Sequence, residues 1–590
     1  MQKYQLGKWD LKELVKNPKS SAFEKQIKDV EQQVKKFQKI RATLNPKMSS
    51  REFRKILGEL EDISEKVSII GGFASLDYSA DTQSDEATAL MTRMSKLGAD
   101  VSNQMLFFDL WWKRGIDEKN AQRLIKESGD LHNFLKHKRL IAKYSLSEPE
   151  EKIINTLDVT GATALVKLYD KITNAFEYEV KIKAKKKKMT REELTSLVRS
   201  TNSKTREDAY KSLLTKFTSN KGVLGEIYQN IVLNWRDEGI EIRGYQSPIS
   251  MRNIGNDVND KTISSLLEVC KKNSNVFQKF FLLKAKMLGV KKLRRYDLYA
   301  PITSKIKEKK YPYDKSVKLV LDSLNRFSSE LSSHAKTVFD QNHVDSSVRT
   351  GKRDGAFCST LNPNITPYVL VNFTEKSRDV FTLAHELGHA VHSIAASEKS
   401  ILVQDPPLPL AETASTFSEL LLYDNLSDKI EDSEKKIMLA EKIDDLYATI
   451  MRQSYFTMFE IDAHKQIANT TTVDELSKTY LANLKEQFGN SVKLTDDFGI
   501  EWSCIPHFYH TPFYCYAYSF GNLLALSLFQ RFKKEGGQFV PSYIEILSAG
   551  GSEKPENLLA EYGIDIMSKQ FWQDGFDYVK DQVRMLSKLN

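Results

Sequence analysis

DVFTLAHELGHAVHS, residues 379–393, is the stretch that decides the expected fold of this chain. Apolar residues recur through it at helical spacing, which predicts an amphipathic helix. Residues four apart on a helix differ by about 40° in direction and lie one turn apart along the axis. His385 and His389 can therefore reach one metal ion, and Glu386 stands beside them. This His-Glu-x-x-His arrangement is typical of two metal ligands and a general base for a water molecule.

A catalytic zinc needs a third protein ligand and one open position. The metzincin pattern would place a glycine at 392 and a histidine at 395, but this chain has His392 and Ala395, which excludes that class. The segment LAETASTFSELLL, residues 410–422, predicts an apolar helix with Glu412 and Glu419 two turns apart on one face. An unpaired carboxylate is costly in such surroundings, which favours a positive partner such as zinc.

We therefore expect Glu412 to be the third ligand and Glu419 to orient a ligand histidine. Two alternatives stay open. His392 is an alternative third ligand, although we expect it to be a packed or hydrogen-bonded helix histidine. Glu419 is alternatively a carboxylate that only pairs helices.

A second cluster lies in WSCIPHFYHTPFYCYAYSFGN, residues 502–522. Hydrolysis of an amide needs donors for the oxyanion that develops in the transition state, and tyrosine hydroxyls and histidine N–H groups can supply them. The candidate donors are His507, Tyr509, His510, Tyr514, Tyr516 and Tyr518. The alternative is an aromatic core helix whose polar tips reach solvent.

Composition narrows the class of protein. The chain has 590 residues, of which 41% are hydrophobic and 28% charged, and this excludes collagen-like, low-complexity and fully disordered chains. Four scattered cysteines are too few for a disulfide framework, which favours a reducing compartment. Residues 1–17 lack the apolar core of a secretory signal, and no apolar run reaches the length of a membrane span. We expect a cytoplasmic protein without a membrane partner.

The charge balance gives little support to a nucleic-acid partner. Lys+Arg exceed Asp+Glu by 87 − 78 = 9 over the whole chain, which is a mild excess. The strongest basic run, KIKAKKKK at 181–188, contains neither the aromatic residues nor the arginines typical of nucleic-acid sites. We interpret it as a solvated strand and turn.

Periodicity predicts a mostly helical chain with little sheet. The predicted helices cover residues 23–37, 51–67, 86–113, 190–235, 260–288 and 314–338. Strands are expected at 176–184, with the lysine run as its turn, and at 355–360 and 367–373 as a hairpin or two edge strands.

These motifs resemble the oligoendopeptidase F branch of the thimet oligopeptidase family of zinc peptidases. The resemblance extends to GAFC and PYVLVNF before the motif helix, to ETASTFSE after it and to IPHFYHTPFYCYAYSFGN near the C-terminus. Upstream, YSLSEPEEKIINTLDVTG and LYDKITNAFEYEV are similar to the amino-terminal region of oligoendopeptidase F. Nearly all of the chain after about residue 130 is covered.

The resemblance implies a mainly α, bilobed, zincin-like metallopeptidase with a deep channel and a small β-sheet beside the active site. We expect an N-terminal helical lobe over residues 1–195 and a zinc peptidase catalytic domain over 196–590. The family's site implies one Zn²⁺ per chain. The residues that match it are His385, His389 and Glu412 as ligands, Glu386 as base, and His507 with Tyr518, or else Tyr514, as transition-state donors.

The expected activity is cleavage of internal peptide bonds in short, unstructured oligopeptides, which are the expected partners. A zinc exopeptidase is one alternative, but it would need a group for the terminal charge of its substrate, and none is obvious. An inactive helical binding scaffold is the other, and the intact Glu386 argues against it.

Overall fold

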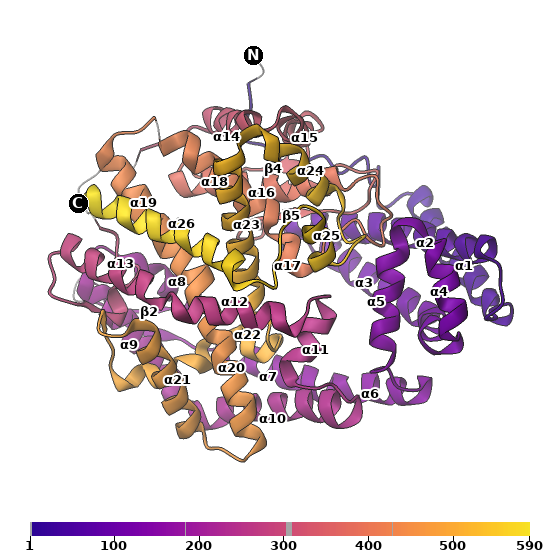
Figure 1. Cartoon of the computed structure of the whole chain (residues 1–590), viewed down its shortest axis with the longest axis horizontal. Helices are drawn as coiled ribbons and strands as arrows, with labels where there is room; N and C mark the ends of the chain where they lie inside the picture. The colour runs from indigo at the N-terminus through magenta and orange to yellow at the C-terminus, as the bar shows by residue number, and fades with distance from the viewer. Residues whose placement is uncertain (1–2, 183–184, 303–308, 428) are drawn as a thin grey trace. The chain divides into compact units, whose positions relative to one another are not determined.

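The computed structural model describes residues 3–182, 185–302, 309–427 and 429–590. The chain is mainly helical, as predicted, and its strands are short. It divides into two compact units, and Figure 1 labels most of their helices and some of their strands. Unit 1 comprises residues 1–143, 308–428 and 531–564, and unit 2 comprises residues 144–307, 429–530 and 565–590.

Unit 1 contains the predicted metal-binding helix. Its α-helices are α1 (Ser21–Gln38), α2 (Ser50–Ala80), α3 (Asp85–Leu110), α4 (Glu118–Lys126), α5 (His132–Ala142), α14 (Tyr313–Phe327), α15 (Ser329–Asp340), α16 (Ser377–Ala395), α17 (Leu408–Ala411), α18 (Thr413–Ser427), α24 (Val540–Ser548) and α25 (Pro555–Glu561). Its strands are β4 (Val344–Asp345), β5 (Phe357–Ser359) and β6 (Tyr368–Leu370).

Unit 2 contains the histidine- and tyrosine-rich segment. Its α-helices are α6 (Glu148–Thr160), α7 (Ala162–Asn174), α8 (Arg191–Ser196), α9 (Ser203–Ser219), α10 (Lys221–Arg236), α11 (Pro248–Gly255), α12 (Asp260–Lys272), α13 (Ser274–Met287), α19 (Asp432–Leu446), α20 (Arg452–Ala468), α21 (Val473–Phe488), α22 (Pro506–His510), α23 (Tyr516–Glu535) and α26 (Lys569–Lys588). The last residues of α23, from Arg531, belong to unit 1. The strands of unit 2 are β1 (Tyr178–Ile182), β2 (Lys185–Met189), β3 (Leu293–Arg294) and β7 (Val492–Lys493).

A three-stranded sheet in unit 1 has the order β4-β6-β5. Strand β4 is parallel to β6, and β5 is antiparallel to it with Cys358 opposite Val369. The strands predicted at 355–360 and 367–373 are thereby confirmed as a pair. Among the described residues, β5 pairs with a strand on one side only, so its other side is an edge.

The helices of unit 1 form as their periodicity predicts. Helix α1 buries one apolar stripe at spacings of three and four residues, made of Phe23, Ile27, Val30, Val34 and Phe37. Phe37 packs edge-on against Phe108 of α3, with ring centroids 5.7 Å apart. The same core includes Tyr368 and Leu370 of β6, so the helices of the first 143 residues support the sheet.

The structure corrects the prediction for the lysine run. Lys185–Lys188 is not a turn but most of strand β2, which pairs antiparallel with β1. Residues 183–184, which connect β1 and β2 in the sequence, lie outside the described residues. Tyr178 and Val180 of β1 and Met189 of β2 are buried, while the β2 lysines are exposed. Glutamates neutralise part of the run through the pairs Lys186–Glu179 and Lys188–Glu177.

Several predicted helices are interrupted. The prediction over 314–338 is two helices that meet at Ser328, whose hydroxyl accepts from the Leu331 N–H and caps α15. The prediction over 260–288 breaks at Asn273, and that over 190–235 comprises α8, α9 and α10. None of the helices in the described part of the chain combines the length and apolar character that crossing a bilayer requires.

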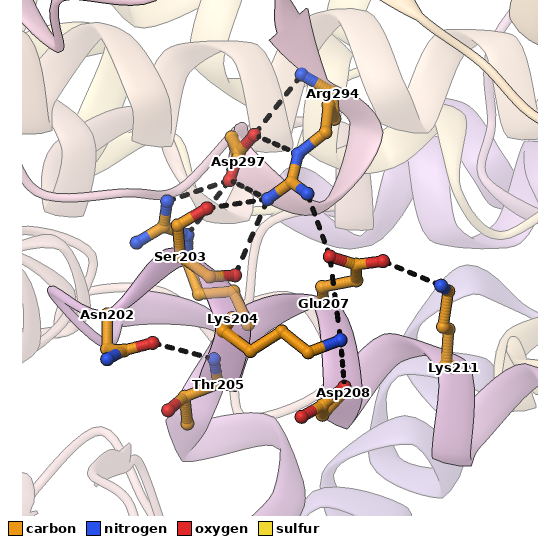
Figure 2. A network of polar contacts seen from close by, with 10 residues as sticks. Asn202, Ser203, Lys204, Thr205, Glu207, Asp208, Lys211, Arg294 and Asp297 are labelled. Atoms are coloured by element: carbon orange, nitrogen blue, oxygen red, sulfur yellow. Dashed lines mark hydrogen bonds and ion pairs between the residues drawn. The ribbon is translucent and has the colours of Figure 1, made fainter.

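A network of charged side chains joins α9 to the segment after β3 in unit 2, and Figure 2 shows its members. Asp297 accepts from Arg206 at 2.7 Å and from Arg294 Nε at 2.9 Å. Arg294 also donates to Glu207 at 2.8 Å. Asp297 is buried, so its two arginine partners offset the desolvation of its carboxylate.

Candidate metal centre and oxyanion donors

Helix α16 is fixed at its start by a side chain three residues into the helix. Asp379 accepts hydrogen bonds from the backbone N–H groups of Thr374 and Lys376, at 2.6 and 3.1 Å. Downstream, the helix buries an apolar face that includes Leu383, Leu387 and Val391. His385 and His389 lie on another face, where about a quarter of each side chain stays exposed. The helix therefore presents both imidazoles to a partly open space.

Gly388 lets helix α18 pack directly against helix α16, one residue before His389. A Cβ atom at Gly388 would lie 2.6 Å from the carbonyl oxygen of Ala414 and 2.8 Å from Ser418 Oγ, both in α18. Any larger residue would push the helices apart. Gly388 is not among the predicted site residues, although a glycine inside an amphipathic helix, where it costs about 1 kcal/mol relative to alanine, is a signal of close packing in the sequence.

The structure brings three ligand atoms to the corners of one small triangle. His385 Nε2 lies 3.2 Å from His389 Nε2, and Glu412 Oε2 lies 3.3 and 3.5 Å from these two nitrogens. A tetrahedral zinc with ligand bonds of about 2.0–2.1 Å would hold its ligand atoms about 3.3–3.4 Å apart. The triangle therefore fits a zinc ion. Within the described residues, this is the one group of three or more His, Cys, Asp or Glu side chains close enough to share a metal.

Glu412 occupies a different local position from the one predicted. It is not inside the helix that carries Glu419 but lies between α17 and α18, where its carbonyl accepts from the Thr416 N–H and starts α18. Ser415 Oγ donates to its carboxylate at 2.7 Å. This hydrogen bond leaves Glu412 oriented toward the histidines.

Glu419 holds the imidazole of His385 from behind. Its carboxylate lies 2.6 Å from Nδ1 of His385, so Nδ1 carries the proton and Nε2 faces the ligand triangle. Burial lowers the pKa of His385, but the hydrogen bond to Glu419 and the nearby charges of the glutamates at 419, 412 and 386 together outweigh it and raise the pKa to about 9. A metal ion would compete with a proton for Nε2. Burial also lowers the pKa of His389, to about 4, which keeps its lone pair available.

Glu386 is buried beside the ligand triangle. Only 7% of it is exposed, and burial raises its pKa to about 7. His385 and a hydrogen bond from the backbone of Cys358 act in the opposite direction. The carboxyl group thus lies between the metal ligands and strand β5, in surroundings that suit a group that takes up and releases a proton near neutral pH.

His392 is not part of the ligand triangle. It is 4% exposed, and burial lowers its pKa to about 3, so it is a neutral packed histidine. Its predicted alternative role as a third ligand is not supported by the ligand geometry, since the group that could hold an ion contains Glu412 in its place.

In unit 2, three of the candidate donors lie together. His507 Nε2 is 3.3 Å from the Tyr518 hydroxyl. The Tyr514 ring is nearly parallel to the His507 ring at 5.9 Å, and its centroid is 5.3 Å from that of Tyr518. Burial lowers the pKa of His507, which favours its neutral form. We call His507, Tyr514 and Tyr518 the donor cluster.

The other candidates of this segment have structural partners. Tyr509 is buried and stacks on Tyr169 with centroids 3.7 Å apart. His510 Nε2 lies 2.7 Å from Asp170. The Tyr516 hydroxyl accepts from an asparagine amide at 2.8 Å. These three residues therefore hold α22 and α23 in place and are not part of the donor cluster.

Comparison with known proteins agrees with this chemistry. The sequence profile of peptidase family M3 matches residues 196–578, which is more than half of the chain. The matched segment contains the three candidate metal ligands, Glu386 and the donor cluster.

Curated relatives are similar over almost the full length. An oligoendopeptidase F homolog of Borreliella burgdorferi is 28% identical, over 99% of this chain and 98% of that protein. An oligoendopeptidase F homolog of Lactococcus lactis is 26% identical, over 92% of this chain and 90% of that protein.

Solved structures share the fold. A crystal structure of a protein from Chlamydophila abortus covers 99% of this chain and 100% of its own, with a TM-score of 0.87 at 24% identity. The crystal structure of oligoendopeptidase-F from Enterococcus faecium covers 96% of this chain and 98% of its own, with a TM-score of 0.72 at 20% identity.

Proposed function

The chain belongs to peptidase family M3, and from this premise we propose that it is a zinc-dependent endopeptidase that hydrolyses internal bonds of short, unstructured oligopeptides. The observation that carries the proposal is the triangle of His385, His389 and Glu412 with the buried Glu386 beside it. Zinc suits this donor set because it prefers imidazole and carboxylate ligands in tetrahedral geometry.

The roles follow from the contacts of each side chain. His385, His389 and Glu412 hold the ion, and Glu419 keeps the His385 imidazole in the tautomer that a ligand needs. The bound zinc would act as a Lewis acid toward the scissile carbonyl and its attacking water. Glu386 takes a proton from that water and later gives it to the leaving amine.

His507 and Tyr518 are proposed as donors to the oxyanion, with Tyr514 as the alternative tyrosine. Their 3.3 Å contact supports the choice of Tyr518, because a hydroxyl and an imidazole in contact can present two donors toward one oxygen. Tyrosine and neutral histidine also keep their protons near neutral pH, as such donors must.

We expect His507→Ala and Tyr518→Phe each to lower kcat by about 10²–10³-fold with little change in KM, because the donors act mainly in the transition state. Steady-state kinetics on one quenched-fluorescent peptide measures both parameters. A neutral Tyr518→Phe beside an impaired Tyr514→Phe would move the role to Tyr514. If both variants kept the wild-type kcat, the tyrosines would be core residues.

The preference for unstructured peptides is inferred from strand β5. The backbone of Cys358 in β5 hydrogen-bonds Glu386, and the edge of β5 that no strand of the described residues covers can pair with an extended peptide by backbone hydrogen bonds. Such pairing tolerates many side chains but needs a segment that is not already folded. A stable domain has its strands paired internally, so it cannot offer one.

A length series of N-acetylated, C-amidated peptides tests the endopeptidase proposal. We expect cleavage at internal bonds of blocked peptides of about 5–20 residues, which span at most about 3.3–3.6 Å per residue, and none in a stable folded domain. Mass spectrometry of the products locates each cut. Failure to cut any doubly blocked peptide would favour an exopeptidase, and efficient cleavage of a folded domain would refute the requirement for an extended segment.

Two further parts of the proposal concern organisation and location. We propose an N-terminal lobe over 1–195 and a catalytic domain over 196–590. The family match from residue 196 supports this division of the sequence. Each of the two compact units contains residues from both segments.

We also propose a cytoplasmic location, which the four free cysteines support.

A further inference from the structure

The turn between α22 and α23 carries part of the donor cluster and has a strained backbone. We call residues Thr511–Cys515 the donor turn. It contains Tyr514, follows the helix of His507 and leads into the helix of Tyr518. Phe513 in this turn has a φ of +58°, in the left-handed region that bulky side chains rarely adopt. Such strain persists only where surrounding contacts impose it.

Two charged side chains, one buried and one half-buried, supply those contacts. The Phe513 N–H donates to Glu460 Oε1 of α20 at 2.8 Å. Arg252 Nε of α11 donates to the carbonyl of Pro512 at 3.1 Å. The Phe513 ring is 1% exposed and packs on the His464 ring, with centroids 4.5 Å apart. The peptide bond before Phe513 is therefore held from both sides.

Glu460 is an unusual group to find in this place. It is 1% exposed, and its second oxygen, Oε2, has no hydrogen-bond partner among the described residues. Burial raises its pKa to about 8, while the Phe513 N–H and the nearby Arg252 act in the opposite direction. A buried carboxyl group that makes one hydrogen bond is costly to retain for stability alone. The one hydrogen bond that its carboxyl group makes within the described residues is with the donor turn.

We propose that Glu460 is a positioning residue for peptide hydrolysis, which fixes the donor turn through the Phe513 N–H and so sets Tyr514 and Tyr518 against His507. The proposal rests on the proposed roles of the donor cluster. Glu460 does not touch the reacting atoms in this scheme. It acts on the tyrosines, because a displaced turn would change their distance from the imidazole.

The distance between His507 and Tyr518 depends on the conformation of the donor turn, because the turn connects them. The 3.3 Å contact of His507 with Tyr518 joins side chains that flank the turn in sequence. The Thr511 N–H still bonds the His507 carbonyl, at 2.9 Å, and the Tyr514 N–H bonds the Thr511 carbonyl, at 3.2 Å. Relaxation at Phe513 would alter the chain between these anchors. A shift of about 1 Å in a catalytic group can lower a rate 10²-fold.

Two substitutions at Glu460 separate its hydrogen bond from its packing. Glu460→Gln keeps an acceptor for the Phe513 N–H, and we expect kcat within about threefold of the wild type. Glu460→Met keeps the length of the side chain but removes the acceptor, and we expect kcat to fall about 10–100-fold with KM nearly unchanged. Equal kcat values for the two variants would overturn the proposal.

A double-mutant cycle distinguishes positioning from general destabilisation. If Glu460 acts through the tyrosine, Glu460→Met should reduce kcat much less in a Tyr518→Phe background than in the wild type. Losses that multiply would overturn the proposal. Should Tyr518→Phe be neutral, the cycle is repeated with Tyr514→Phe, and if both tyrosine variants are neutral, the proposed donor roles fail and this inference fails with them. If a tyrosine variant is impaired but Glu460→Met is fully active, the role of Glu460 is overturned and the proposed donor roles stand.

Controls address folding in unit 2. Asp444 is also buried there and pairs with Lys284 instead of the donor turn. Asp444→Asn should lower the Tm without lowering kcat at a temperature where it is folded. If Glu460→Met does not fold, Arg252→Met removes the other hydrogen bond to the turn and should show the same reduced effect in the tyrosine variant. A multiplicative loss there would overturn the proposal.

Discussion

Glu386→Gln should remove nearly all turnover while the protein stays folded and keeps its metal. The substitution preserves the shape of the side chain but cannot take a proton from water, and general-base catalysis contributes about 10²–10⁴-fold to a rate. We expect a fall in kcat of at least that size. Glu386 is not one of the three ligand side chains, so zinc content should stay near one per chain. Elemental analysis and peptide kinetics on the same preparation measure the zinc content and kcat together.

The matched control for Glu386 lies on the same helix. Asp379→Asn weakens the cap of α16, which accepts from the N–H groups of Thr374 and Lys376. Loss of such a cap costs about 0.5–2 kcal/mol of stability. We expect a lower Tm with a nearly normal kcat for this variant, opposite to the pattern of Glu386→Gln. A Glu386→Gln enzyme with substantial residual activity would assign the base to another residue.

The local part of the site could be predicted because one helix carries it. His385, Glu386 and His389 lie within five residues, so helical geometry alone places them together. The apolar surroundings of Glu412 and its spacing from Glu419 predict it as a ligand, but they do not predict the helix break at this residue. The break changes the backbone around Glu412, but its carboxylate still lies 3.3 and 3.5 Å from the two histidine Nε2 atoms.

The features that could not be predicted depend on contacts between distant segments. The space beside Gly388 is occupied by α18, and nothing in the sequence around Gly388 specifies that partner. Lys185–Lys188 forms a strand because β1 offers it a pairing edge, which overrides the low strand propensity of lysine. The left-handed Phe513 is held by Glu460, about fifty residues earlier in the chain, and lacks the glycine that usually marks such a conformation.

Some misses did have a local signal. Ser328 caps α15 through its side chain, and serine is a preferred residue at that position, so the break in the helix predicted over 314–338 was available from the sequence. The pattern of apolar residues continues across the break, and periodicity alone therefore favoured one long helix. A capping residue such as Ser328 therefore indicates a helix break even where the apolar pattern continues from one helix into the next.

Glu412→Ala should lose the metal, in contrast to Glu386→Gln. The carboxylate supplies one corner of the ligand triangle, and two imidazoles alone leave zinc weakly held. We expect zinc well below one per chain after dialysis, and no turnover above background. A ligand at a hundred times its Kd stabilises a protein by about 2.7 kcal/mol, so added zinc should raise the Tm of the metal-free wild type but not that of the variant.

Glu419→Gln provides the graded comparison for the same measurement. Glu419 contacts Nδ1 of His385 at 2.6 Å and is not one of the three proposed ligands. Its substitution should therefore lower the affinity for zinc about 10–100-fold and leave some activity at high zinc concentration. The expected order of zinc affinity is wild type, Glu419→Gln, Glu412→Ala. Stoichiometric zinc in purified Glu412→Ala would contradict the ligand assignment. A Glu419→Gln variant that lost more zinc than Glu412→Ala would exchange the two roles, because the residue whose removal weakens the metal most is the one that binds it directly.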